Sequence, residues 1–215
     1  MIVNELVTGI IVIVIAYLLG SIPFAYIVTR LVSGQDIRKL GSGNVGGNNV
    51  YRHVGLTAAI PVALFDVAKG TAAVATAHWL LEVPLFEPNI YIFLAASAAV
   101  VGHIWSIYLK FTGGNGLSAT IGVLSILMPW ETLIVVALII ILKFVTRNLV
   151  LATNISLLTV PIFVWFIEKD MIYVVFCVVL VVVLILNFIP TARKALVKAG
   201  NRQNLLTDLL RRNKR

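Results

Sequence analysis

Charged residues are scarce in this sequence, and cysteine is nearly absent. Only 12% of the 215 residues are charged and 60% are hydrophobic, whereas soluble domains are about 25% charged. The mean hydropathy is +1.02, so the composition excludes a soluble globular domain and indicates an integral membrane protein. The single cysteine, Cys177, lies in an apolar run, which excludes a disulfide framework and a cysteine metal site. No histidines and carboxylates have metal-ligand spacing, and neither a P-loop nor a serine elbow is present.

The apolar runs predict about seven membrane-spanning helices, because a helix needs about 20 apolar residues to cross the hydrocarbon core. The first run has no basic segment before it and is too long for a signal-peptide core, so we expect it to be a retained span. We expect an all-α bundle, with residues 1–190 as one transmembrane domain and 191–215 as a basic tail. The predicted spans are residues 5–32, 56–81, 88–109, 117–129, 131–145, 149–167 and 171–190.

Basic residues predict how this bundle lies in the membrane. Arg38, Lys39 and Arg52 occupy the first connection, Lys110 the third, and Lys143 and Arg147 flank the fifth. The tail is strongly basic, whereas the second, fourth and sixth connections are acidic or mixed. The positive-inside rule then places the N-terminus outside and the C-terminus in the cytoplasm, in the plasma membrane. The net charge is +8. Because the basic tail directly follows a span, we expect anionic lipid rather than nucleic acid as its partner.

A glycine-rich segment at residues 41–52 separates the first two predicted spans. Four glycines fall within seven residues, and a glycine in a helix interior costs about 1 kcal/mol relative to alanine, so we expect a loop. Glycine lets main-chain N–H groups approach a ligand, and side-chain donors without a carboxylate favour an anion, most often phosphate. An ordinary polar loop is the alternative. The candidate binding residues are Gly41, Ser42, Gly43, Asn44, Asn48, Asn49 and Arg52.

A second glycine-rich segment, residues 102–116, closes the third predicted span and opens the fourth. Glycines before a helix present bare N–H groups at its positive end, which is a second device for holding an anion. The predicted topology places both segments on the cytoplasmic side, where together they favour binding of a phosphorylated compound. The candidates here are His103, Lys110, Gly113, Gly114, Asn115 and Gly116, with His103 equally open to an ordinary buried role.

Two ionisable residues, Asp66 and Lys69, lie inside the second predicted span. Such groups are costly within the membrane and usually functional, and the i, i+3 spacing puts both on one helix face. A self-neutralising pair that anchors neighbouring helices and a direct role with substrate are both open.

At these residues the chain resembles the bacterial membrane acyl-phosphate:glycerol-3-phosphate acyltransferases. The resemblance covers roughly residues 10–125 and implies seven transmembrane helices with an active site open to the cytoplasm. It also implies transfer of an acyl group from acyl phosphate to the 1-hydroxyl of glycerol 3-phosphate, which gives lysophosphatidic acid for phospholipid synthesis. It implies no cofactor: neither metal, acyl carrier protein nor coenzyme A. The matching motifs, in order, are Gly20-Ser21-Ile22-Pro23-Phe24, Gly41 to Arg52, Asp66-x-x-Lys69-Gly70, and Gly102 to Gly116.

By this resemblance, Ser42 and Arg52 bind phosphate and orient the acceptor, and the second loop supplies backbone donors. The chain departs from the family pattern at several positions. Asn115 replaces a lysine, and loss of one such donor can cost roughly 10²–10³ in rate. Either Lys110 or Lys69 supplies the charge, or the acceptor differs, or the chain is inactive. The other departures are Asn48 and Ala119, each in place of threonine, and Asn201-Arg202-Gln203-Asn204 in place of a His-x-x-Asn motif.

Two other functions remain open from the sequence. A membrane transporter or binding protein for a phosphorylated metabolite also presents glycine-rich helix ends to anions. A catalytically impaired family member, retained as a partner of other lipid enzymes, is the second alternative.

Overall fold

The computed structural model describes the backbone of residues 2–199 and the side chains from Glu5 to Pro190. Within these residues the chain is helical and contains no strand, which confirms the all-α prediction. The chain divides into two compact units, Met1–Pro129 and Trp130–Arg215.

Among the described residues, six helical segments are long and apolar enough to cross a membrane. The predicted span 117–129 is instead a shorter helix, α6 (Leu117–Leu127), of 11 residues. At 1.5 Å per residue, α6 is about 16 Å long and too short to cross the hydrocarbon core of about 30 Å alone. The six segments are Glu5–Ser33, Leu56–Leu81, Ile90–Leu109, Pro129–Thr146, Leu149–Ile167 and Met171–Pro190.

The first segment is broken, although the sequence predicts a single helix over 5–32. It consists of α1 (Ile2–Ser21) and α2 (Phe24–Ser33), which are separated at Pro23. Proline has no N–H group to continue the helical ladder, and Pro23 adopts φ −93° and ψ 72°, outside the helical region. The break places the carbonyl group of Ile22 next to the second span, where it becomes part of the candidate site.

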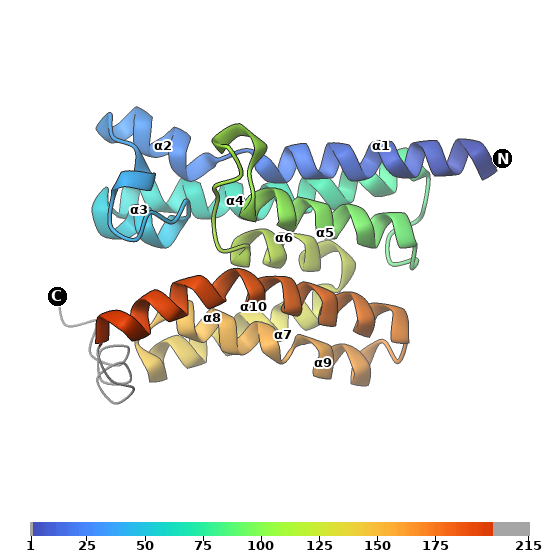
Figure 1. Cartoon of the computed structure of the whole chain (residues 1–215). Helices are drawn as coiled ribbons and strands as arrows, with labels where there is room; N and C mark the ends of the chain where they lie inside the picture. Colours follow the sequence, from blue (N-terminus) through green and yellow to red (C-terminus); the bar gives the residue numbers. More distant parts are fainter. Residues whose placement is uncertain (1, 200–215) are drawn as a thin grey trace. The chain divides into compact units, whose positions relative to one another are not determined.

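Helices α1, α4 (Leu56–Leu81) and α5 (Ile90–Ile104) run side by side in the first unit, and α6 packs on α4 (Figure 1). Small residues allow this close packing, as is common between membrane helices. A Cβ atom at Gly70 would lie 2.5 Å from the carbonyl oxygen of Ala119, and one at Gly102 would strike the carbonyl of Tyr17. The tightly packed helices provide a rigid base for the connecting loops.

The two long connections of the first unit contain short helices. The first holds η1 (Ile37–Lys39) and α3 (Gly47–His53), and the second holds η2 (Ile107–Leu109). The sequence predicts a loop throughout 41–52, whereas in the structure the helix α3 begins at Gly47. The propensity cost of Gly47 is outweighed here because α3 packs against α4, with Val50 fully buried.

The second unit contains α7 (Pro129–Thr146), α8 (Leu149–Leu158), α9 (Val160–Ile167) and α10 (Met171–Ala199). The predicted span 149–167 is divided at Thr159, because Pro161 lies in the first turn of α9. The backbone of α10 continues past residue 190, so the first part of the predicted tail is helical. The sequence motif at 201–204 lies outside the described residues.

Candidate functional site

The first glycine-rich segment makes tight turns between η1 and α3. Gly41 and Gly43 have φ angles of +53° and +75°, a left-handed conformation that residues with a Cβ atom rarely adopt. A Cβ atom at Gly41 would also collide with the His53 ring and lie 2.7 Å from Oδ1 of Asn49. These two positions therefore require glycine for conformation as well as for space.

The side chain of Asn49 holds this segment together. It is only 3% exposed. Its Nδ2 donates to the carbonyl oxygens of Leu40 and Asn44 at 3.0 Å each, and to that of Ile37 at 3.3 Å. Its Oδ1 accepts from the main-chain N–H of Ser42 at 3.4 Å. Both ends of the amide are therefore bonded within the loop. The structure thus favours a role for Asn49 in holding the loop conformation over a contact with a ligand.

Other polar residues of the segment remain available. Ser42 is exposed, and among the described residues its Oγ accepts from the main-chain N–H of Asn44 alone, at 3.4 Å. Arg52 is exposed on α3, and neither its guanidinium nor the half-buried Asn48 amide pairs with another described residue. Asn48 and Arg52 are four residues apart and so lie on one face of α3. The segment thus offers the hydroxyl proton of Ser42, an amide and a guanidinium that no other described residue binds.

The second glycine-rich segment closes onto the end of α5. Lys110 and Phe111 are both left-handed, with φ angles of +55° and +59°, and they turn the chain back toward the helices. The main-chain N–H of Gly114 donates to the carbonyl oxygen of His103 at 2.9 Å. A Cβ atom at Gly113 would collide with the carbonyl oxygens of His103 and Ile104. The glycines are therefore required by the close approach of two backbones.

Helix α6 begins directly after this segment with an uncapped N-terminus. Gly116 is the N-cap residue at φ +84°, and no side chain caps the helix. The first N–H groups of a helix have no intrahelical acceptor and carry partial positive charge. The predicted helix start after the glycines is confirmed. Asn115 is half-buried beside these groups, and its side chain has no partner among the described residues.

The two glycine-rich segments contact each other. The main-chain N–H of Val45 donates to the carbonyl oxygen of Gly113 at 3.2 Å. The position of a Cβ atom at Gly114 lies 2.8 Å from the carbonyl oxygen of Val45 and against the His103 ring. Val45 also belongs to a buried apolar cluster with Leu109 beneath both segments. The prediction that the two segments lie together is thus confirmed.

A buried charge network lies next to these segments. Lys69 Nζ is 2.9 Å from Asp66 Oδ1 and donates to the carbonyl oxygen of Ile22, at the α1–α2 break, at 2.8 Å. The Nδ1 atom of His103 lies 3.5 Å from the same Asp66 oxygen. All three side chains are at most 6% exposed. Because Lys69 contacts protein acceptors, this geometry favours the anchoring role that the sequence left open.

Two hydrogen bonds tether the second segment to α1. The hydroxyl of Tyr17 donates to the carbonyl oxygen of Trp105 at 2.8 Å. The hydroxyl of Ser106 donates to the carbonyl oxygen of Ser21. Ser21 belongs to the first of the four sequence motifs. The first motif, at the end of α1, therefore supports the second glycine-rich segment, which contains the fourth motif.

Sequence comparison identifies the family. The model of the glycerol-3-phosphate acyltransferase family matches residues 10–197. Glycerol-3-phosphate acyltransferase 1 of Dehalococcoides mccartyi is 40% identical over 199 residues, which cover 90% of this chain and 94% of that protein. The glycerol-3-phosphate acyltransferase of Rhizobium meliloti is 41% identical over 150 residues, covering 69% of this chain and 70% of the relative. The chain belongs to the glycerol-3-phosphate acyltransferase family.

Solved structures support the same fold for this family member. It is similar to the crystal structure of an integral membrane glycerol 3-phosphate acyltransferase in its glycerol 3-phosphate form. The TM-score is 0.80 at 24% identity, and the match covers 88% of this chain and 92% of that chain. The lysophosphatidic acid form of that enzyme gives a TM-score of 0.77 at 23% identity. The resemblance in the sequence motifs and the membrane fold are thus both confirmed.

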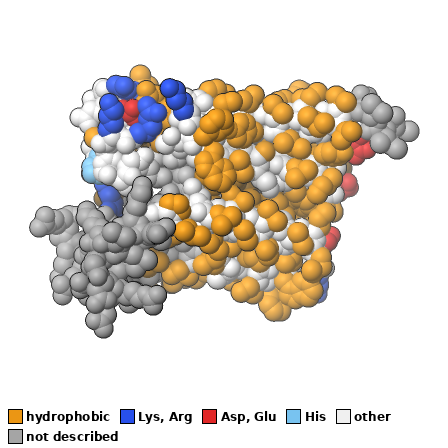
Figure 2. Space-filling view, in the orientation of Figure 1, with side chains coloured by type: hydrophobic (Ala, Val, Ile, Leu, Met, Phe, Trp, Pro, Cys, Tyr) orange, Lys and Arg blue, Asp and Glu red, His pale blue; other side chains and the backbone are white. Residues whose placement is uncertain are grey.

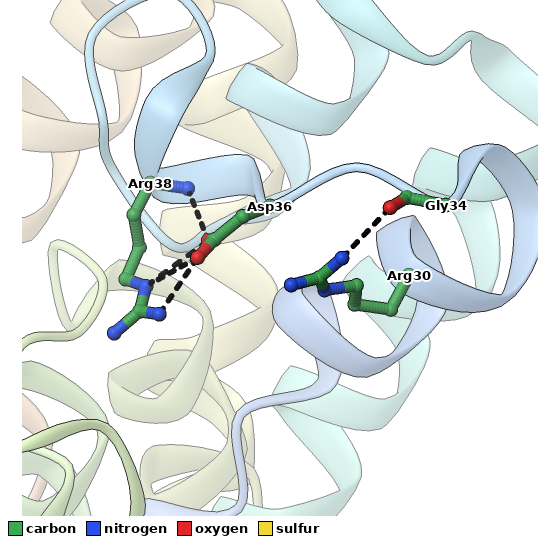
Figure 3. A network of polar contacts seen from close by, with 4 residues as sticks. All are labelled: Arg30, Gly34, Asp36 and Arg38. Carbon is green, nitrogen blue, oxygen red and sulfur yellow. Dashed lines mark hydrogen bonds and ion pairs between the residues drawn. The ribbon is translucent and has the colours of Figure 1, made fainter.

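Sequence reasoning missed an ion pair that fixes the start of the first connection. Arg38 donates to Asp36 from Nε at 3.0 Å and from Nη2 at 2.7 Å, and its main-chain N–H donates to the same carboxylate at 3.0 Å (Figure 3). These bonds lower the pKa of Asp36 from 3.8 to about 2 and raise that of Arg38. The pair holds η1, whose Ile37 carbonyl is an acceptor for Asn49. An acidic residue two positions before an arginine was the available sequence signal.

Proposed function

We propose that this protein transfers an acyl group from acyl phosphate to the 1-hydroxyl of glycerol 3-phosphate. The observation that carries the proposal is the junction of the two glycine-rich segments at Val45 and Gly113. Both substrates contain phosphate. The joined segments offer, within one site, the side chains of Ser42, Asn48 and Arg52 and the first N–H groups of α6. Family membership supplies the reaction class.

The chemistry needs positioning and charge stabilisation more than a protein base. The hydroxyl oxygen of glycerol 3-phosphate attacks the acyl carbonyl carbon, and the bond from that carbon to the phosphate oxygen breaks. The products are lysophosphatidic acid and inorganic phosphate, and the hydroxyl proton passes to a substrate phosphate. We assign Ser42 and Arg52 to binding phosphate and orienting the acceptor. The first N–H groups of α6, after Gly116, stabilise developing negative charge.

The membrane setting fits the acyl donor. The acyl chain reaches the site from the lipid phase, and the protein carries six membrane-length helical segments among its described residues. The positive-inside rule orients the face with the basic connections toward the cytoplasm of the cell, where glycerol 3-phosphate is available. A cysteine replacing the exposed Gln35, with Cys177→Ser, tests this orientation in cells. Labelling by an impermeant maleimide only after the membrane is opened is expected, and labelling of intact cells would overturn the cytoplasmic assignment.

The decisive assay combines purified protein with palmitoyl phosphate and radiolabelled glycerol 3-phosphate. Equal amounts of lysophosphatidic acid and inorganic phosphate are expected, and Arg52→Ala is expected to abolish most of the turnover. A lack of product where the Dehalococcoides mccartyi relative turns over would overturn the proposal. Uptake of unchanged glycerol 3-phosphate into proteoliposomes, without acylation, would support the transporter alternative instead.

A further inference from the structure

A group of basic side chains lies at the α2 end of the first unit, outside the two glycine-rich segments. Figure 2 shows Lys and Arg side chains gathered there around an acidic side chain. Arg30 on α2 and Arg38 and Lys39 on η1 are exposed, and Asp36 is the carboxylate between them. We call these three cations the α2 basic cluster. Three cations against one carboxylate leave an excess of two positive charges.

The protein holds two of these cations in fixed positions. The guanidinium carbons of Arg30 and Arg38 lie 5.7 Å and 5.2 Å from the centroid of the same Tyr26 ring. Arg30 also donates from Nη1 to the carbonyl oxygen of Gly34 at 2.8 Å, and Arg38 is fixed by Asp36 (Figure 3). The remaining N–H groups of both guanidiniums have no acceptor among the described residues. Two like charges are therefore prearranged with free donors, which favours a multivalent anion.

The cluster follows the end of the first membrane-length segment, Glu5–Ser33. Glu5 is the first charged residue of the broken segment Glu5–Ser33, and the about 20 residues after it reach Phe24 at the far side of the hydrocarbon core. Arg30 lies in the last turn of α2, at the end of this segment. The headgroup layer extends roughly 5–8 Å beyond the core on each side. We therefore expect the cluster to lie next to this layer.

The neighbouring face of α2 is suited to the same layer. Leu31 and Val32 are 80% and 60% exposed, and Ile27 is 38% exposed. An exposed apolar face flanked by cations is typical of a helix that lies at the boundary between acyl chains and headgroups. We therefore expect an anion bound at the cluster to lie next to the acyl chains of the membrane.

We propose that the α2 basic cluster is a docking surface for the phosphate headgroups of anionic phospholipids. Charge complementarity and depth support a membrane lipid rather than a free phosphate in solution. The guanidiniums of Arg30 and Arg38 donate to phosphate oxygens, and Lys39 adds attraction without fixed geometry. The three cations lie outside the residues assigned to the substrates, so the inference does not depend on the proposed acyl transfer.

A crosslinking experiment at Leu31 tests the surface locally. Full-length protein carrying the photoreactive residue benzoylphenylalanine in place of Leu31 is reconstituted without substrates in vesicles of phosphatidylcholine and phosphatidylglycerol. Mass spectrometry of the crosslinked protein then gives the ratio of the two lipid adducts relative to the bulk composition. Each basic residue near an anionic surface contributes about 1 kcal/mol, so two excess charges predict about 30-fold enrichment of phosphatidylglycerol.

Variants separate the cluster from the overall charge of the protein. Arg30→Gln combined with Lys39→Gln removes the excess charge, and enrichment is expected to fall to about one. Lys169→Gln lowers the protein charge by one at an exposed position of the second unit and is expected to leave enrichment unchanged. Equal enrichment in the double variant and the parent would overturn the proposal. Loss of enrichment on adding inorganic phosphate would also overturn it, because the surface would then bind free phosphate.

Discussion

Replacing Asn49 by alanine is the sharpest test of how the first glycine-rich segment is built. The change removes a buried amide that makes two hydrogen bonds of 3.0 Å and two of 3.3 and 3.4 Å. At about 1 kcal/mol for each short bond and about 0.5 kcal/mol for each long one, the loop loses about 3 kcal/mol. This loss corresponds to about a 150-fold shift from the closed toward an open loop. The transmembrane helices lose no contact, so their melting temperature is expected to change little.

Two measurements on Asn49→Ala separate loop geometry from substrate contact. Acyl transfer should fall by up to about 100-fold in kcat/KM, because Ser42 loses its fixed position. Trypsin should also cleave faster after Arg38 or Lys39, since loop opening frees this segment. Asn154→Ala is the matched control, because its Nδ2 donates to the carbonyl oxygen of Val150 at 2.7 Å, remote in sequence from both loops.

The possible outcomes of the Asn49→Ala experiment have different meanings. Activity within about threefold of the parent, with unchanged trypsin cleavage, would refute the role of Asn49 in the loop. Loss of activity without faster cleavage would instead show a direct contact with substrate, as the sequence alone suggests. Loss of activity together with faster cleavage supports the geometry described above.

Three further experiments probe other parts of the first unit. Asp66→Asn or Lys69→Met alone should destabilise the protein by about 3–5 kcal/mol in unfolding experiments, whereas the double variant should lose less, because no buried charge remains unpaired; additive losses would contradict this pairing. Gly114→Ala should lower kcat/KM at least tenfold, because the added Cβ atom would collide with the first glycine-rich segment. Gly47→Ala should be tolerated, since its Cβ atom would meet neighbours no closer than 3.7 Å. Equal effects of the two variants would contradict this explanation. Asp36→Asn should lower the melting temperature at neutral pH. The pKa of Asp36 in the folded protein, about 2, lies below its ordinary value of 3.8, so the stabilisation by the ionised carboxylate is present above pH 3.8 and disappears as the pH falls toward 2. The difference in melting temperature between parent and variant should therefore close only at those acidic values.

The sequence predicted the membrane fold and the meeting of the loops, because both follow from strong local signals. Long apolar runs identify most spans whatever their tertiary contacts. Glycines before a helix predicted the uncapped start of α6 after Gly116. The broken first span was missed, since its apolar run continues through Pro23 and hydropathy does not register a missing N–H group.

The roles of individual polar residues were harder to predict, because a sequence does not show which donors are already used. Asn48 and Asn49 are adjacent and chemically identical, yet only Asn49 points into the loop and bonds to its carbonyls. Lys69 is similarly engaged by protein acceptors, whereas Arg52 is free among the described residues. The Asp36–Arg38 pair was missed because an acidic residue two positions before an arginine is too common a pattern to stand out, although this pair fixes η1 beside Asn49.

The cation that compensates for Asn115 can be argued from these contacts. The sequence left Lys69 and Lys110 as alternatives, but the ammonium of Lys69 is buried and bonded to Asp66 and Ile22. The side chain of Lys110 is exposed and has no partner among the described residues, and its left-handed backbone opens the turn that leads into the second glycine-rich segment. We therefore expect Lys110→Ala to lower kcat by about 10²–10³ in acyl transfer. Adding Asn115→Lys to that variant should restore most of the loss. Rescue would show that the two positions supply the same charge, whereas full activity of Lys110→Ala alone would exclude Lys110 from that role.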